Sequence, residues 1–230
     1  MGDDSLTTTT DKGVIRMPSE LLGQLSREKI VAIARGFTLE ETLSAAKALA
    51  DGGVVFLEAT LNTDGALNII SKLREQFGDR MRIGAGTVLD IGQAKEAIAA
   101  GAQYLISPNV DEEVIYHAVE QGLDVWPGAM TPTEIVNAYK AGASAIKLFP
   151  MGTLGIGYLK EVRAPLNHIP FIATGGVNLQ NIADVLEAGA IAVGMGGKLL
   201  DPALVKAGKF DELRDLARSY VDRAHGASLA

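Results

Sequence analysis

The chain contains no cysteine, so it can form no disulfide and has no thiolate for catalysis. It also lacks any run of about 18 continuous apolar residues, the length that a membrane-spanning helix needs. Its first residues, MGDDSLTTTTDKG, are polar and acidic, without the basic and then apolar order of a signal peptide. We therefore expect a cytoplasmic protein that has no membrane partner.

Positive charge and histidine are scarce as well. With 28 Asp and Glu against 21 Lys and Arg, the formal net charge is −7, which argues against nucleic acid as a partner. The three histidines, His117, His168 and His225, lie far apart in the sequence, and no H-E-x-x-H motif occurs. Because a metal site needs clustered ligands, we expect no metal ion.

Glycine, in contrast, is abundant, and short apolar runs alternate with helical patterns along the chain. Eight apolar runs occur, at 30–34, 54–60, 81–86, 103–108, 124–128, 145–150, 171–176 and 191–197. This alternation with short connections predicts an α/β protein, a single-domain (β/α)8 TIM barrel. A doubly wound open sheet is the alternative, but no G-x-G-x-x-G motif follows the first run.

The expected barrel occupies residues 26–230 and includes a C-terminal helix at about 210–225. Residues 1–25 are expected to be a flexible leader, and an N-terminal helix within them is compatible with the sequence.

Helix starts are marked by capping residues between the apolar runs. Thr38 with Glu41 and Thr131 with Glu134 fit the capping box, and Pro132 suits the first turn of the second helix. Further N-cap candidates are Asp90, Asp111 and Asn178.

Polar side chains near the ends of the apolar runs are the candidates for chemistry, because TIM barrels carry their active sites at the carboxyl ends of the strands. They are Glu58, Asn62, Thr87, Lys147 and Thr174. A desolvated lysine has a lowered pKa and attacks carbonyl carbon, and a neighbouring carboxylate can shuttle protons. A structural ion pair between Lys147 and Glu58, closing the barrel interior, is the alternative interpretation.

Two glycine pairs follow the last two runs, in ATGGVN and GMGGKLL. TIM barrels often bind phosphate with backbone N–H groups of these two loops. We therefore predict a phosphate site, to which a neighbouring lysine adds charge; the alternative is that the glycines only form turns. The residues of this expected site are Gly175, Gly176, Gly196, Gly197 and Lys198.

Six segments resemble, in the same order, those of the 2-keto-3-deoxy-6-phosphogluconate (KDPG) and 4-hydroxy-2-oxoglutarate (KHG) aldolases. They are VVFLEATLNT, IGAGTVLD, YLISPNVD, PGAMTPTE, AIKLFPMGTLG and IATGGVN. The resemblance covers about residues 28–222 and is carried mainly by K-L-F-P together with the glutamate strand. It implies a class I aldolase on a (β/α)8 barrel that works without a cofactor, usually as a homotrimer.

The same resemblance implies roles for individual residues. Lys147 would be the Schiff-base lysine and Glu58 the acid and base. Thr87 would contact the pyruvyl carboxylate, Pro108 would wall the pocket, and Thr174 would lie beside the substrate carbon chain. The two glycine pairs would form the phosphate loops.

The sequence departs from the family pattern at positions that bear on the substrate. The glutamate strand often reads L-E-V-T-L-R-T in the family, whereas Asn62 replaces the arginine here, which removes a fixed positive charge. Relatives that act on the galactonate epimer resemble this sequence in carrying L-N. Lys198 stands where the second glycine loop often has serine, and Met151 where Ala, Ser or Gly is frequent.

The expected function is reversible cleavage of KDPG, of KHG, or of both, to pyruvate plus an aldehyde. The partners would be the 2-keto acid substrate and pyruvate, within the Entner–Doudoroff pathway of carbohydrate metabolism. Alternatives are an aldolase for 2-keto-3-deoxy-6-phosphogalactonate, a phosphate-binding barrel isomerase or synthase, and a non-catalytic self-assembling scaffold.

Overall fold

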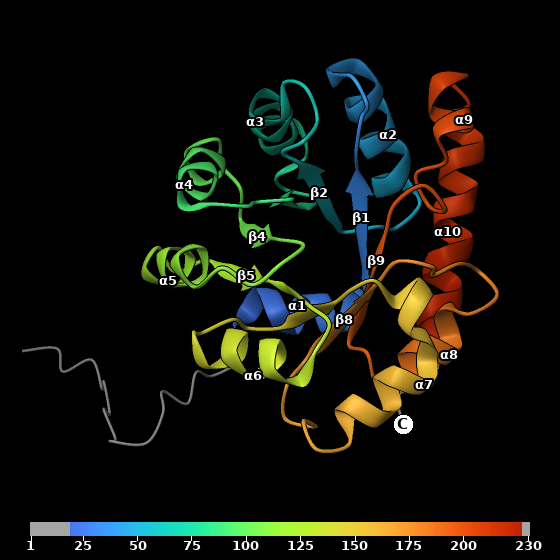
Figure 1. Cartoon of the computed structure of the whole chain (residues 1–230). Coiled ribbons are helices and arrows are strands. Elements are labelled where there is room, and N and C mark those ends of the chain that lie inside the picture. The colour runs from blue at the N-terminus through green and yellow to red at the C-terminus, as the bar shows by residue number, and fades with distance from the viewer. Residues whose placement is uncertain (1–18, 227–230) are drawn as a thin grey trace, which may run out of the picture.

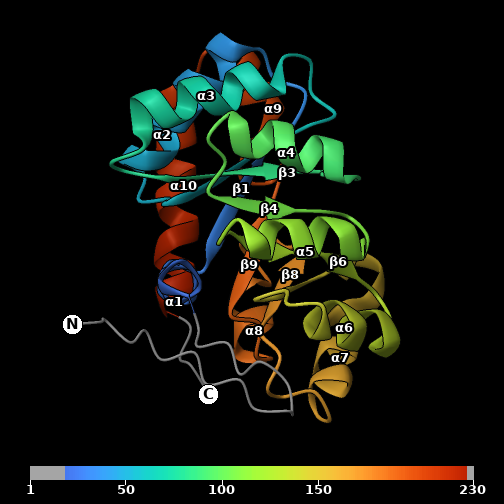
Figure 2. The same ribbon diagram turned by 90° about the vertical axis from the view of Figure 1, so that its left-hand side faces the viewer.

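The computed structural model describes residues 19–226 and has parallel strands at its centre with helices around them (Figure 1 and Figure 2). Most of the expected leader therefore lies outside the described residues. The strands are β1 Ile30–Ala34, β2 Phe56–Thr60, β3 Arg82–Gly86, β4 Tyr104–Ile106, β5 Asp124–Trp126, β6 Gly128–Ala129, β7 Ile146–Leu148, β8 Phe171–Thr174 and β9 Ala192–Met195. The helices are α1 Glu20–Glu28, α2 Leu39–Asp51, α3 Ala66–Phe77, α4 Ile91–Ala99, α5 Glu112–Glu120, α6 Pro132–Lys140, α7 Met151–Arg163, α8 Ile182–Glu187, α9 Pro202–Lys206 and α10 Phe210–Gly226.

The sheet is the expected barrel, with one strand more in the described residues than the eight predicted. The strand order is β5-β4-β3-β2-β1-β9-β8-β7-β6, so its two edges are neighbours in the sequence. β5 and β6 are two pieces of the fifth run, interrupted at Pro127, which has no N–H to donate. The Ser144 N–H donates to the Val125 carbonyl at 3.3 Å and the Lys147 N–H to the Pro127 carbonyl at 3.0 Å, so these bonds join the two edges.

The capping residues position the helices largely as predicted. Both capping boxes are present, and Asp90 and Asp111 cap α4 and α5. Asn178 was expected to cap the next helix, but this prediction is wrong, because α8 begins later and has Asn181 at its N-cap. The Asn178 side chain instead accepts hydrogen bonds from the Gln180 and Asn181 N–H groups and forms the turn before the helix.

The inside of the barrel is a small apolar core closed at its N-terminal end by α1. Phe56, Tyr104 and Trp126 fill this core, and α1 adds Leu22 and Leu25. α1 spans the expected division near residue 26 because its apolar face belongs to the barrel interior. The carboxyl ends of the strands are left open at the opposite end, where the site lies.

The outer core lies between the strands and the surrounding helices. α10 packs along α2 and α8, and it passes Gly52 so closely that a Cβ there would lie 2.7 Å from the Cβ of Ala217. α10 occupies the segment where the C-terminal helix was expected. In residues 19–226, no helix has the length and apolar character to cross a membrane.

Candidate active site

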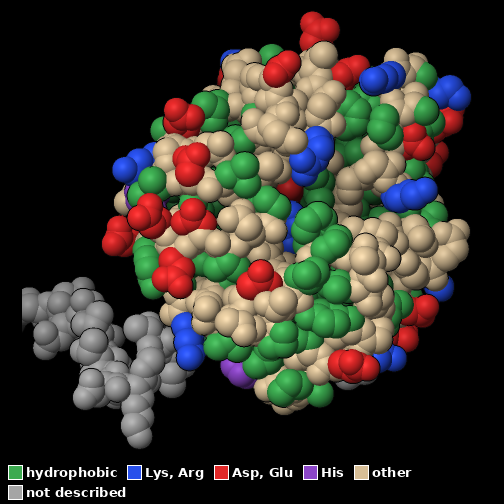
Figure 3. Space-filling model, in the orientation of Figure 1, with side chains coloured by type: hydrophobic (Ala, Val, Ile, Leu, Met, Phe, Trp, Pro, Cys, Tyr) green, Lys and Arg blue, Asp and Glu red, His purple; other side chains and the backbone are tan. Residues whose placement is uncertain are grey.

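A cavity of about 570 Å³ opens among the carboxyl ends of the strands, within the range of small-molecule sites. Figure 3 shows a hollow near the middle of this face with Lys or Arg side chains beside it. Most residues singled out from the sequence line the cavity: Thr87, Pro108, Lys147, Thr174, Gly175, Gly176, Gly196, Gly197 and Lys198. Glu58 and Asn62 do not line it: Glu58 is fully buried, and Asn62 is exposed.

Lys147 enters the cavity from the middle of β7, where its backbone lies between Gly128 of β6 and Ile172 of β8. Only 6% of the residue is exposed, and its Nζ lies 5.2 Å from the centre of the Phe149 ring. Burial lowers the pKa of Lys147 below its usual range, the charge of Glu58 opposes this shift, and the charge of Arg35 adds to it. The neutral amine is therefore more accessible than in an exposed lysine.

Glu58 projects into the barrel from β2 and is 1% exposed. Its carboxyl group lies over Gly86 of β3, where a Cβ would come within 2.1 Å of Oε1. Burial raises the pKa of Glu58, while the charges of Lys147 and Arg35 oppose that shift. Oε1 has no hydrogen-bond partner among the described residues.

The structure argues against the alternative interpretation of Lys147 and Glu58 as a structural ion pair. No ion pair joins them among the salt bridges of residues 19–226, although each charge acts on the pKa of the other. The two side chains are thus close enough to couple but not neutralised by direct contact. A buried amine and a buried carboxyl group that influence each other without forming an ion pair are suited to covalent chemistry with proton transfer.

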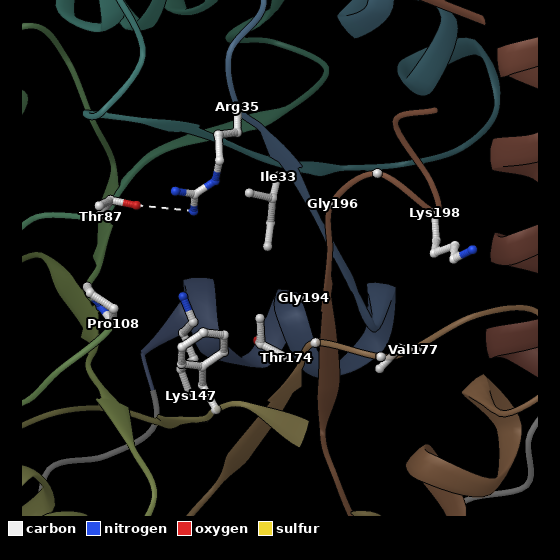
Figure 4. Close-up of a pocket in the computed structure, with 14 residues that line it drawn as sticks. Ile33, Arg35, Thr87, Pro108, Lys147, Thr174, Val177, Gly194, Gly196 and Lys198 are labelled. Atoms are coloured by element: carbon white, nitrogen blue, oxygen red, sulfur yellow. Dashed lines mark hydrogen bonds between the residues drawn. The ribbon is translucent and has the colours of Figure 1, made fainter. Parts of the chain in front are cut away.

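Arg35 is a site residue that the sequence interpretation missed. It follows β1, lines the cavity and points into it from the side opposite Lys147 (Figure 4). Its guanidinium donates to Asn62 Oδ1 at 3.0 Å and to Thr87 Oγ1 at 3.3 Å. The residue after β1 therefore brings a positive charge to the cavity, and Asn62 accepts one of its hydrogen bonds.

Thr87 has a left-handed backbone conformation with φ of 59°, which is strained for a β-branched residue. Such conformations persist where the surrounding structure enforces them, and they cluster at functional sites. Here the conformation accompanies the hydrogen bond that Thr87 accepts from Arg35.

The first glycine loop is fixed by its own backbone and by the asparagine that caps α8. Gly175 and Gly176 have φ of 97° and 71°, a region that other residues rarely adopt. Asn181 donates to the Gly176 carbonyl at 3.0 Å and accepts from the Asn178 N–H at 2.8 Å. Within the described residues, the Gly176 N–H donates to no backbone acceptor, so this donor faces the cavity without a partner in the loop.

The second glycine loop leaves space beside it. A Cβ on Gly196 would meet nothing within 4 Å, and one on Gly197 would first meet Pro202 at 3.7 Å. Lys198 is exposed, and its ammonium group points away from Lys147 in Figure 4. Lys198 therefore lines the cavity without directing its charge at the amine.

Arg35 could have been found by the rule that selected the other candidates, since it is the first polar residue after the apolar run IVAIA. Phe149 and Val177 also line the cavity, but an apolar residue at a strand end carries no comparable signal.

Fold and site together define a barrel enzyme with a buried lysine in its cavity and a fully buried glutamate that acts on the pKa of this lysine. Residues 22–216 match the family described as Aldolase: KDPG and KHG aldolase. The 2-dehydro-3-deoxy-6-phosphogalactonate aldolase of Escherichia coli K12 is 38% identical over 171 residues, which cover 74% of this chain and 83% of the relative. The 2-dehydro-3-deoxy-phosphogluconate aldolase of Treponema pallidum is 33% identical over 196 residues, or 84% and 92% of the two chains.

Among solved structures, a KDPG aldolase from Legionella pneumophila with pyruvate captured as a covalent carbinolamine superimposes with a TM-score of 0.80 at 28% identity, covering 85% of this chain and 95% of that one. The chain belongs to the KDPG and KHG aldolase family and is a carbon–carbon lyase.

Proposed function

We propose that the protein is a class I aldolase that cleaves a 2-keto-4-hydroxy acid reversibly to pyruvate and an aldehyde through a Schiff base on Lys147. The observation that carries this proposal is the buried amine of Lys147, which opens into the cavity and has a lowered pKa. The pyruvate carbinolamine captured in the Legionella relative supports it by analogy.

The reaction begins when Lys147 Nζ attacks the C2 carbonyl carbon, and loss of water then gives an iminium ion. Glu58, acting through a water molecule, accepts the proton of the C4 hydroxyl. The C3–C4 bond breaks, its electron pair moves to the iminium nitrogen, and the aldehyde leaves. Glu58 returns the proton to C3 of the enamine, and hydrolysis of the resulting iminium releases pyruvate and restores the free amine.

Arg35 and Thr87 are the proposed partners of the carboxylate next to C2. Arg35 stands across the cavity from Lys147, and a guanidinium ion binds a carboxylate with two parallel hydrogen bonds. Thr174 and Pro108 line the space between these groups and the glycine loops. We place the carbon chain of the substrate along them.

The far end of the substrate is proposed to be a phosphate at the two glycine loops. The open space at Gly196 and Gly197, the Gly176 N–H group without a backbone acceptor and the charge of Lys198 support an anion there. KDPG is the leading substrate. The galactonate epimer is a second candidate, which the similarity to the Escherichia coli phosphogalactonate aldolase favours. KHG, which has no phosphate, would use the same amine.

Pyruvate release from the gluconate and galactonate phosphates and from KHG tests this function. We expect turnover of at least one phosphate ester, with a lower KM than for KHG. Absence of pyruvate from all three substrates, with a correctly folded protein, would contradict an aldolase of this type.

The homotrimer, the cytoplasmic location and the role in the Entner–Doudoroff pathway are predictions from the resemblance. Leu89 and Met130 are large apolar side chains exposed on loops after the strands, and a second copy of the chain would cover them in a trimer. Light scattering is expected to give three times the 24.1 kDa mass of one chain. A much larger closed particle would instead favour the scaffold alternative, which does not account for the buried amine.

A further inference from the structure

One row of the barrel interior carries three ionisable side chains. Glu58 of β2 lies opposite Gly84 of β3. Ala85 lies opposite Leu105 of β4, so in this parallel pair Gly84 lies opposite Tyr104. Tyr104 in turn lies opposite Asp124 of β5. Residues opposite one another in neighbouring strands face the same side, so this row continues from the proposed acid and base down the barrel wall.

The members of this row share an unusual property. Among residues 19–226, the buried side-chain atoms without a hydrogen-bond partner are Glu58 Oε1, the Tyr104 hydroxyl and Asp124 Oδ1. Buried polar groups in proteins are nearly always paired with protein or with ordered water. Glu58 Oε1 and the Tyr104 hydroxyl therefore need a partner that ordered water can supply.

Tyr104 reaches toward Glu58 and not toward Asp124. A Cβ on Gly84 would lie 2.2 Å from Cε2 and 2.4 Å from Cζ of Tyr104, so the ring lies across Gly84 in the direction of β2. It stacks on Trp126 with ring centres 4.5 Å apart, and this contact keeps it in place. Asp124, at the other end of the row, instead accepts the hydroxyl of Ser19.

The carboxyl group of Glu58 lies beside that ring. Its Oε1 covers Gly86, the next inward-facing position of β3 after Gly84. Two such positions are about 6.6 Å apart along a strand, so the Tyr104 ring over Gly84 and the Glu58 carboxyl group over Gly86 lie at adjacent inward-facing positions of β3. The negative charge of Glu58 also contributes to the raised pKa of Tyr104, after the larger effect of burial.

We propose that Tyr104 is a positioning residue for Glu58: its hydroxyl donates through ordered water to Oε1 and favours the carboxylate form. This inference rests on the proposed function, in which Glu58 is the acid and base. The charged groups acting on Glu58 from the other elements are Lys147 of β7 and Arg35 after β1. Tyr104 approaches from β4 and stabilises the carboxylate from within the barrel.

The test is the variant Tyr104→Phe, which keeps the ring and removes only the hydroxyl. Loss of the donor disfavours the ionised carboxyl, so we expect the acid limb of kcat/KM against pH to move up by about one unit, with little change in KM. Tyr116→Phe is the control, because Tyr116 is an exposed residue on α5, and its profile should match that of the wild type. An unchanged acid limb in Tyr104→Phe overturns the inference.

A second measurement does not depend on catalysis. Carbon-13 NMR titration of labelled glutamate carboxyl groups, with the Glu58 signal assigned by its loss in Glu58→Gln, should show a higher pKa for Glu58 in Tyr104→Phe. The melting temperature should stay equal or fall, because a bridged hydroxyl is lost. A rise in melting temperature with an unmoved Glu58 titration means that the hydroxyl has no partner, which also overturns the inference. Failure of the proposed function is distinguishable, since the wild type would then release no pyruvate.

Discussion

Replacing Gly86 with alanine is expected to displace the proposed acid and base without unfolding the barrel. An added Cβ would lie 2.1 Å from Glu58 Oε1 and 2.6 Å from its carboxyl carbon. Ordinary contacts of a Cβ begin near 3.4 Å, so the carboxyl group must move by roughly 1 Å. A misplacement of about 1 Å costs on the order of 10²-fold in rate, so we expect kcat to fall by about this factor. KM should change little, because the cavity wall is untouched.

The assay is pyruvate release coupled to lactate dehydrogenase, with thermal unfolding measured in parallel. The matched control is Gly23→Ala on α1, where a Cβ would meet only the Arg27 guanidinium at 3.8 Å. This control should keep the wild-type kcat and gain about 0.5–1 kcal/mol of stability, because alanine suits a helix better than glycine. A Gly86→Ala enzyme with wild-type kcat would refute the placement of Glu58 in the reaction.

Arg35→Met should raise KM for every 2-keto acid roughly 10–100-fold through loss of a charged hydrogen bond; an unchanged KM would mean that Arg35 does not bind the carboxylate. Gly197→Val should raise KM about tenfold or more for a phosphate ester and leave KHG unaffected, and equal losses for both would indicate a general folding defect. Glu58→Gln should lose most turnover. Burial raises the pKa of Glu58 above about 4.5, its value in the unfolded chain. The protonated carboxyl group therefore contributes its full stability below pH 4.5, and this stability is lost as the pH rises through the pKa of the folded protein. The melting temperature of Glu58→Gln relative to wild type should therefore increase from pH 4 to pH 8, and a constant difference would contradict a buried, charge-disfavouring site.

The barrel was predictable because its signals are local and repeated. Each apolar run is short enough for a buried strand, and residues such as Thr38 and Thr131 mark helix starts with a hydrogen bond confined to one turn. The division of the fifth strand was not predicted, although Pro127 was visible. Whether Pro127 divides the strand depends on how the two edges of the sheet meet, and this contact joins residues that are far apart in the sequence.

The site residues that could be predicted are those whose side chains are charged although they lie in apolar strands. Lys147 and Glu58 stand out because burying a charged group in an apolar strand costs free energy, which a functional role can explain. Arg35 did not stand out, because an arginine just after a strand is ordinary; only its bonds to Asn62 and Thr87 show its direction. The role proposed for Tyr104 depends on strand register across Gly84, which no spacing within one segment reveals.

The most direct test of the central claim is reduction of the Schiff base by borohydride in the presence of pyruvate. Borohydride converts an iminium to a stable secondary amine, so the protein should lose activity and carry a pyruvyl adduct on the peptide that contains Lys147. Lys147→Met, which fills the same space without an amine, should fold, form no adduct and release almost no pyruvate. An adduct on another lysine such as Lys198, or near-normal turnover by Lys147→Met, would contradict the account.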